Sequence, residues 1–197
     1  MARGGAHTLA VIGAGAQARS HLAAIREVRP IDQVFVYDIN PDAARRYADE
    51  MAEKYAVPVK IAGSVAEAVR DADIVCTLCP AREAYLTRDM VRPGTHINAV
   101  GTFTPATREV TSDLIAAARL YSDYTPATRA ESGEYLAPLK EGLIGEDHIL
   151  GSVGELLLGR AEGRVSDGDI TVFDALGLAV EDIASAKLVY QEVSGAR

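Results

Sequence analysis

A glycine-rich turn is the strongest chemical signal in this chain of 197 residues. The run Gly13-Ala14-Gly15-Ala16-Gln17-Ala18 has the form G-x-G-x-x-A, and the apolar run Leu9–Ile12 precedes it. Gly13 permits a tight turn, Gly15 lets a pyrophosphate approach the backbone, and Ala18 allows the following helix to pack closely on the strand. A helix that begins in this turn offers unpaired N–H groups to phosphates. The turn therefore predicts a dinucleotide-binding site.

A carboxylate stands about 20 residues after this turn, where a dinucleotide site needs one. Asp38 ends a second predicted strand, and its side chain is expected to accept hydrogen bonds from the adenosine ribose and to repel a 2′-phosphate. NAD is therefore favoured over NADP, because Arg45 and Arg46 stand too far along the next helix to bind that phosphate. The alternative is a glycine turn that binds nothing, with Asp38 as a helix cap before Pro41.

Other candidate residues give weaker signals. Cys76-Thr77-Leu78-Cys79 has the form of a redox or zinc motif, but it ends a predicted buried strand and no second pair of cysteines exists. The histidines lack ligand spacing, so we predict no metal site. Pro93–Gly101 predicts a strand whose carboxyl end lies at the ligand-binding edge. Within it Asn98 is expected on the ligand side, the alternative being that its amide satisfies nearby backbone.

Elements that would position these residues alternate along the chain. The predicted strands are Thr8–Ile12, Gln33–Asp38, Val59–Ile61, Asp73–Leu78, Thr95–Val100 and Leu120–Ser122. The predicted helices are Ala16–Val28, Pro41–Tyr55, Val65–Arg70 and Asp113–Ala118. Ser64 and Glu67 are expected to form a capping box at the third helix. Such alternation implies right-handed crossovers and a parallel sheet covered on both faces.

The predicted fold class is therefore α/β, a doubly wound Rossmann-type parallel sheet with helices on both faces. Residues 1–125 are expected to form the NAD-binding core. Residues 126–197 are expected to continue the same domain, with extra helices, a last strand at Asp169–Phe173 and a final helix at Leu176–Val193.

Composition limits the classes of partner. The 20 basic and 28 acidic residues leave a net charge of −8, which argues against nucleic acid and membrane surfaces. No run of ~20 apolar residues predicts a membrane span, and the apolar stretch at Leu9–Ile12 is too short for a signal peptide. Two closely spaced cysteines cannot staple a chain of this size, so a reducing, cytoplasmic location is expected.

Together these segments resemble the ornithine cyclodeaminase/μ-crystallin family. The matching pieces are the glycine turn at 13–18, Ser64–Val69 with Ala72–Val75, Pro93–Gly101, Gly154-Glu155 with Gly163-Arg164, and Asp169–Asp174. The resemblance runs from about Leu9 to Val193. It implies a Rossmann domain paired with a substrate and dimerisation domain that is built mostly from N-terminal sequence. We expect that N-terminal region to lie outside this chain.

The resemblance also assigns roles to individual residues. The cofactor positions that it implies are Gly13, Gly15, Ala16, Gln17, Asp38, Cys79, Asn98, Val100, Gly101 and Ala175. Cys79 stands where the family has a Thr, and Ala175 replaces a Ser near the nicotinamide. Phe103 occupies the position of the catalytic Asp of cyclodeaminases, and Thr107 that of a substrate-side Lys. Phe cannot transfer protons, so ornithine cyclisation is not expected and no catalytic residue is assigned.

Two classes of function remain open from sequence. The first is an NAD-dependent amino-acid dehydrogenase, imine reductase or cyclodeaminase that is incomplete as a single chain. Its substrate would be a small amino acid or imine, and its partner a separate N-terminal domain or further copies of the chain. The second is a non-catalytic NAD(H)-binding remnant, which Phe103, Thr107 and Ala175 favour. Exposed apolar surface is expected in either class, and with it self-association.

Overall fold

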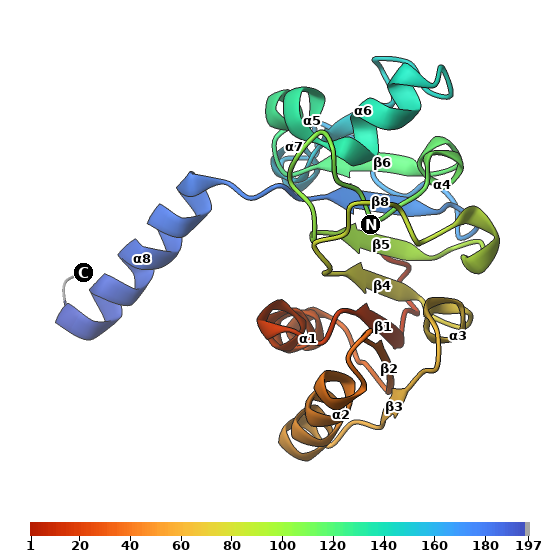
Figure 1. Ribbon diagram of the computed structural model, residues 1–197. Coiled ribbons are helices and arrows are strands. Elements are labelled where there is room, and N and C mark those ends of the chain that lie inside the picture. Colours follow the sequence, from red (N-terminus) through yellow and green to blue (C-terminus); the bar gives the residue numbers. More distant parts are fainter. Residues whose placement is uncertain (196–197) are drawn as a thin grey trace.

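Parallel pairing joins eight strands into one sheet in the computed structural model, which describes residues 1–195 (Figure 1). The strands are β1 (Thr8–Ile12), β2 (Gln33–Tyr37), β3 (Val59–Ile61), β4 (Ile74–Thr77), β5 (His96–Ala99), β6 (Arg119–Ser122), β7 (Ile149–Ser152) and β8 (Thr171–Asp174). Their order across the sheet is β3-β2-β1-β4-β5-β8-β6-β7. The direction of winding reverses between β1 and β4, so the predicted doubly wound Rossmann-type sheet is confirmed.

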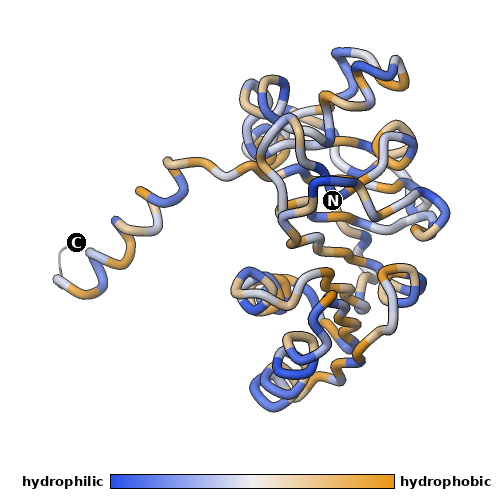
Figure 2. Tube along the Cα trace, viewed as in Figure 1, coloured by the Kyte–Doolittle hydropathy of each residue, from blue (hydrophilic) through white to orange (hydrophobic). Residues whose placement is uncertain are grey.

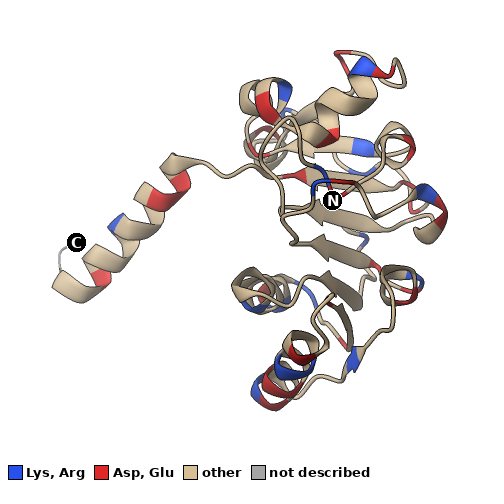
Figure 3. Cartoon of the chain, in the orientation of Figure 1, with Lys and Arg blue, Asp and Glu red and all other residues tan. Residues whose placement is uncertain are grey.

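Helices cover both faces of this sheet. They are α1 (Ala16–Val28), α2 (Pro41–Tyr55), α3 (Val65–Val69), α4 (Ser112–Ala116), α5 (Thr125–Glu131), α6 (Gly133–Lys140), α7 (Val153–Leu157) and α8 (Ala179–Ser194), with a 3-10 turn at Arg88–Met90. In Figure 1, α1 and α2 lie on one face, and α3 and α4 lie on the other. Figure 3 shows the charged residues mostly on helices and loops, with few on the strands.

Two apolar cores follow from this layering. Leu9 and Val11 of β1 point to one face and pack with Tyr47 of α2. Ala10 and Ile12 point to the other face and join the core beneath α3 and α4. Side chains alternate between the faces of a strand, so β1 must be apolar at both positions to be buried on both sides. In Figure 2 the trace is mostly orange where Figure 1 places β1 and β4, and mixed in colour toward β6 and β8.

The predicted element boundaries agree closely in the first half of the chain. The bounds of β1, β3, α1 and α2 match the predicted ranges, and the other strands and helices differ by one or a few residues at their ends. The predicted capping box at α3 is wrong in one respect. Ser64 accepts from the Glu67 amide, but Glu67 Oε2 accepts from the amide of Gly63 rather than that of Ser64. Strand β7 was also missed, because Leu150 is exposed and Gly151 interrupts a pattern that is too short to detect.

The last helix differs most from expectation. Helix α8 begins at Ala179 rather than Leu176 and projects away from the sheet (Figure 1). None of its described side chains is buried, and Val180, Ile183 and Tyr190 are each about two-thirds exposed. Their spacing of three and seven residues places them near one face of the helix. No helix within residues 1–195 has the length and apolar character of a bilayer span.

Candidate functional site at the carboxyl edge of the sheet

The glycine turn links β1 to α1 and forms a cradle. The Gly13 amide donates to the Tyr37 carbonyl at 2.8 Å, and Gly13 has a φ of +100°, which favours glycine. A Cβ at Gly13 would lie 2.9 Å from Cys79 Sγ, whereas a Cβ at Gly15 would meet no atom within 4 Å. The turn is therefore closed on the protein side at Gly13 and open at Gly15. That open side is where a pyrophosphate would approach the backbone.

Asp38 is fixed beside this turn by two backbone amides. Its Oδ2 accepts from Ala14 at 2.7 Å and its Oδ1 accepts from Asn40 at 2.8 Å. The alternative role of Asp38 as the cap of the next helix is wrong, because Asn40 caps α2. The Asn40 side chain accepts from the amides of Asp42 and Ala43. Asp38 therefore couples the end of β2 to the glycine turn and keeps a carboxylate at the edge of the cradle.

A cavity of about 500 Å³ opens next to the cradle. Among the residues that line it are the predicted site residues Gly13, Gly15, Asp38 and Cys79. Sequence reasoning did not predict the other lining residues, among them Ile39 and Tyr85. Ile39 is 90% exposed and offers an apolar contact on the Asp38 side, where the adenosine half of a dinucleotide would bind.

Helix α1 starts directly behind this cavity. Ala16 and Gln17 are its first two residues, and both are exposed. No side chain caps the first turn of α1, which leaves its amides free to meet an anion. Arg45 and Arg46 are exposed on α2 and are not among the lining residues of the cavity; Arg45 pairs with Asp42 at 3.3 Å.

The remaining predicted contacts lie further along the sheet edge and do not line the cavity. Asn98 Nδ2 donates to Cys76 Sγ at 3.5 Å, on the neighbouring strand β4. Val100 donates its amide to Thr77 at 3.1 Å, and Ala175 donates to Ala99 at 3.0 Å. These bonds extend the strand ladders past β5 and β8. Cofactor contact by Asn98, Val100 and Ala175 stays a prediction, as it does for the residues of the cradle.

Gly101 lies where the chain leaves β5, in very close contact with the end of β4. A Cβ there would lie 2.3 Å from both the amide nitrogen and the carbonyl oxygen of Cys79. It would also lie 2.5 Å from Oε1 of Glu109. Gly101 is therefore required for steric reasons, and it connects the predicted cofactor residues to a buried carboxylate.

Glu109 is the functional candidate that sequence reasoning missed. It is fully buried, and both of its carboxylate oxygens accept two hydrogen bonds. Oε1 accepts from the Cys79 amide at 2.7 Å and from the Tyr85 hydroxyl at 2.6 Å. Oε2 accepts from Thr77 Oγ1 and from the Gly101 amide, each at 2.8 Å. No local pattern in the sequence signals this residue, because its partners come from other segments.

Two more buried carboxyls lie near Glu109. Glu134 Oε1 accepts from the Glu109 amide at 2.6 Å, and burial raises the pKa of Glu134 to about 7. Asp174 accepts from Ser132 Oγ at 2.6 Å, and burial raises its pKa well above the usual value. Burial also raises the pKa of Glu109, while hydrogen bonds from Tyr85, Cys79 and other donors act in the opposite direction. Three buried carboxyl groups therefore lie beneath this edge of the sheet, and none of these hydrogen bonds comes from an Arg, Lys or His side chain.

The cysteines lack the properties of a redox pair. Both are free, and burial raises the thiol pKa of Cys76 to about 12 and that of Cys79 above its usual value. A protonated thiol is a poor nucleophile and a poor metal ligand. Among the described residues, no group of three or more His, Cys, Asp or Glu side chains is arranged to hold a metal ion.

The buried acid Glu134 predicts a pH-dependent stability. The unfolded chain loses the Glu134 proton near pH 4.5, whereas the folded chain holds it to about pH 7. Stability is therefore lost as the pH rises between these values, by about 3 kcal/mol in total. Glu134→Gln is expected to be more stable than the wild type at about pH 8 and similar at about pH 5, because a glutamine amide needs no proton. Urea denaturation at both pH values measures this difference, and an equal effect at the two pH values would contradict it.

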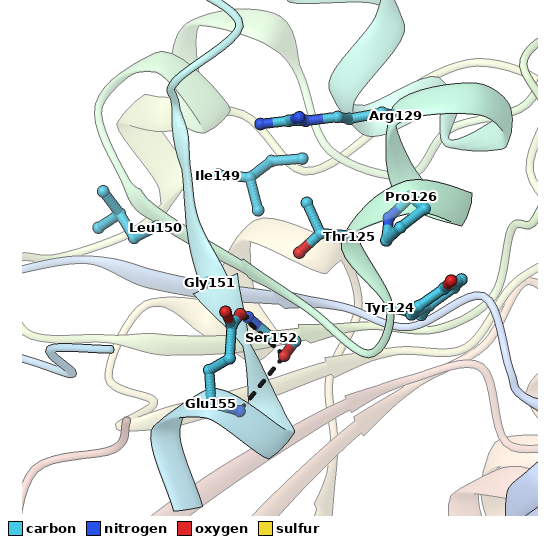
Figure 4. A pocket seen from close by; sticks show the side chains of 9 residues that line it. All are labelled: Tyr124, Thr125, Pro126, Arg129, Ile149, Leu150, Gly151, Ser152 and Glu155. Atoms are coloured by element: carbon cyan, nitrogen blue, oxygen red, sulfur yellow. Dashed lines mark hydrogen bonds between the residues drawn. The ribbon is translucent and has the colours of Figure 1, made fainter. Parts of the chain in front are cut away.

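A second hollow, shown in Figure 4, lies at the opposite end of the sheet between α5 and the β7–α7 junction. Its volume is about 390 Å³, and exposed Arg129 and Glu155 contribute opposite charges to its lining. Ser152 and Glu155 bond to each other in the capping box of α7. Its polar groups therefore serve local structure, and we assign it no role.

Phe103 and Thr107 follow β5 on the loop toward Glu109. Phe103 is 65% exposed, and Thr107 Oγ1 is 2.8 Å from Thr104 Oγ1. Neither side chain carries an acidic or basic group. The described residues therefore present no exposed proton-transfer group at position 103, where the family resemblance places one.

Comparison with known proteins agrees with this geometry. The profile of the ornithine cyclodeaminase/mu-crystallin family matches residues 1–197. Delta(1)-pyrroline-2-carboxylate reductase of Bacillus cereus is 36% identical over 192 residues, which are 97% of this chain and 59% of the relative. The ketimine reductase mu-crystallin of Mus musculus is 36% identical over 98% of this chain and 58% of the relative.

Solved structures extend the agreement to three dimensions. The Thermococcus litoralis Delta(1)-pyrroline-2-carboxylate reductase, in complex with NADH and L-proline, superposes with a TM-score of 0.96 at 38% identity. The match covers 99% of this chain and 60% of that protein. This chain thus spans about three fifths of the length of the relatives that it matches. With the profile match over its whole length and relatives above 30% identity, this chain belongs to the ornithine cyclodeaminase/mu-crystallin family.

Proposed function

We propose that this chain binds NAD(H) and forms the cofactor-binding part of an oxidoreductase that acts on small amino acids or imines. The observation that carries the proposal is the cradle: Gly15 leaves space for a pyrophosphate while Asp38 is held beside it. The relatives named pyrroline-2-carboxylate reductase and alanine dehydrogenase support the substrate class. The bound NADH and NAD of two structural neighbours support the cofactor.

The residues present fit NAD(H). The amides of the first turn of α1 would meet the pyrophosphate, and the Asp38 carboxylate would accept from the adenosine ribose hydroxyls. The same carboxylate would repel the 2′-phosphate of NADP. When bound, the cofactor supplies hydride to, or removes it from, the carbon that carries the substrate nitrogen. The chain's own residues bind and orient it.

The substrate side requires groups beyond those described. A substrate carboxylate needs a cationic partner, and we propose that it comes from a segment or chain that corresponds to the part of the relatives outside the match. Exposed Phe103 favours reductase or dehydrogenase chemistry over cyclodeamination. Hydride transfer depends less on a proton-transfer group at this position than cyclodeamination does, and a phenylalanine supplies none. Phe103 equally supports the second candidate, a chain that binds NAD(H) and catalyses nothing. Free Cys76 and Cys79 support a reducing, cytoplasmic location for either candidate.

Calorimetric titration with NADH and NADPH tests the proposal. NADH is expected to bind with a Kd in the micromolar range, which corresponds to about −8 kcal/mol, and NADPH more weakly. Absence of binding by either nucleotide would overturn the proposal. NADH oxidation in the presence of Δ1-pyrroline-2-carboxylate then separates the candidates. Turnover supports an enzyme, and binding without turnover supports the non-catalytic candidate for the chain by itself.

We further propose that the exposed apolar face of α8 is covered by a second chain. Purified alone, this chain is expected to self-associate, because Val180, Ile183 and Tyr190 face water. Ile183→Asp is expected to shift it to the monomer, whereas Glu181→Gln, at an exposed and already polar position in the first turn of α8, leaves the assembly unchanged. Light scattering during size-exclusion chromatography measures both. A monomeric wild type, or equal behaviour of the two variants, would refute this proposal.

A further inference from the structure

One buried carboxylate connects three segments around the candidate site. The amide of Cys79 follows β4, the amide of Gly101 follows β5, and the Tyr85 hydroxyl comes from the loop after β4. All of them donate to Glu109. The backbone carbonyl of Glu109 also accepts from the amides of Tyr85 and Leu86, so the same residue holds the loop by main chain and side chain.

These segments border one particular half of a dinucleotide site. Asp38 follows β2, which places the adenosine half on the β1–β2 side of the point where the winding reverses. The second mononucleotide half then lies over the ends of β4 and β5, which carry Cys79 and Gly101. Cys79 and Tyr85 line the same cavity as Asp38, on the part of its wall that follows β4, whereas Glu109 itself is fully buried.

From this arrangement we propose that Glu109 is a positioning residue, which sets the shape of the nicotinamide side of the site by holding Cys79, Tyr85 and Gly101. The inference rests on the proposed function, because it needs a bound dinucleotide. It goes beyond that function by giving a role to a residue that touches no ligand.

The hydrogen-bond geometry explains why a carboxylate is needed at this position. Each of its oxygens accepts from one backbone amide and one hydroxyl. Hydroxyls can rotate to accept a bond, but a backbone amide can only donate. A glutamine in either orientation would turn its NH₂ group toward the amide of Cys79 or of Gly101. One segment end would lose its partner and shift, since Gly101 and Cys79 are already in close contact.

Paired ligands test the proposal. NADH carries the nicotinamide ring, and ADP-ribose retains the adenosine and pyrophosphate without it. In Glu109→Gln, NADH is expected to bind at least about tenfold more weakly. ADP-ribose, whose pyrophosphate would lie at the Gly13 turn beside Cys79, is expected to lose no more than about threefold. Glu155→Gln is the matched control, because Glu155 also accepts hydrogen bonds but lies at the far end of the sheet. It is expected to leave both affinities unchanged.

A second variant covers the case in which Glu109→Gln fails to fold. Thr77 is fully buried and is not a lining residue of the cavity, and its hydroxyl donates to Glu109. Thr77→Val keeps the shape of the side chain and removes one donor. This variant is expected to weaken NADH binding about threefold and to leave ADP-ribose binding unchanged, because only one of the four hydrogen bonds to the Glu109 carboxylate is lost.

Thiol alkylation adds a readout that needs no nucleotide. The Cys79 amide is bonded to Glu109, so Glu109→Gln is expected to raise the alkylation rate of Cys79 several-fold in the free protein. Fully buried Cys76 serves as the internal reference and is expected to stay protected. Equal exposure of both thiols would instead indicate general unfolding and count against a positioning role.

The outcomes separate this inference from the proposed function. Equal weakening of NADH and ADP-ribose, or no change in either, would overturn the positioning role while leaving NAD(H) binding intact. A wild-type chain that binds neither ligand would overturn the proposed function, and the inference with it. The positioning role is supported if both Glu109→Gln and Thr77→Val weaken NADH binding more than ADP-ribose binding. It is supported further if Cys79, but not Cys76, becomes more reactive in Glu109→Gln.

Discussion

Gly101→Ala is expected to lower the free energy of unfolding by about 2–4 kcal/mol and to remove NADH binding. The added Cβ would lie 2.3 Å from Cys79 backbone atoms and 2.5 Å from Glu109 Oε1. Neither neighbour is the free end of a flexible side chain, because the first is backbone and the second is held by hydrogen bonds. The ends of β4 and β5 must therefore separate, which breaks bonds to Glu109. Urea denaturation and NADH titration measure the two effects.

Gly15→Ala is the informative control for this variant. A Cβ at Gly15 meets no protein atom within 4 Å, so the stability of the fold is expected to stay within about 0.5 kcal/mol of the wild type. The new methyl group would instead occupy the open side of the cradle and weaken NADH binding. If Gly101→Ala proved as stable as Gly15→Ala, the close contact between the ends of β4 and β5 would not exist in solution.

Asp38→Ala is expected to weaken NADH binding by about tenfold or more and to narrow the difference between NADH and NADPH. The wild-type carboxylate is expected to accept hydrogen bonds from the ribose hydroxyls and to repel a 2′-phosphate. Its removal is therefore expected to lower the affinity for NADH more than the affinity for NADPH. The ratio of the two affinities is the decisive quantity. Asp38 also accepts from the Ala14 amide, and loosening of the glycine turn would weaken both nucleotides together.

Asp38→Asn separates these two contributions. An asparagine keeps an acceptor for the Ala14 amide and removes the negative charge. The affinity for NADPH is therefore expected to rise relative to that for NADH, while the glycine turn keeps its conformation. Calorimetry with both nucleotides on the three proteins gives the comparison. An NADH to NADPH ratio that is the same in wild type, Asp38→Ala and Asp38→Asn would show that Asp38 does not contact the ribose.

Local patterns in the sequence were sufficient for most of the sheet and for the position of the glycine turn and Asp38 at its edge. Strand β1, helix α1 and helix α2 are marked by apolar periodicity, Pro41 and the glycine turn, so their bounds followed from neighbouring residues alone. Asp38 could be placed because its role depends on a fixed distance from that turn. These features involve residues close together in the chain, or separated by one crossover.

Only the tertiary structure revealed the buried carboxylate beneath the ends of β4 and β5. Glu109 is one of many acidic residues in the sequence, and its importance appears only when the sheet brings Thr77, Cys79 and Gly101 around it. Its donors are 8 to 32 residues away in the chain, and no periodic pattern connects positions at such distances. The apolar residues of α8 predicted a helix correctly, but apolar character cannot tell which surface will cover them. The sequence thus determined most of the elements and the glycine turn, while packing across the sheet determined which carboxylate is bonded to the ends of β4 and β5.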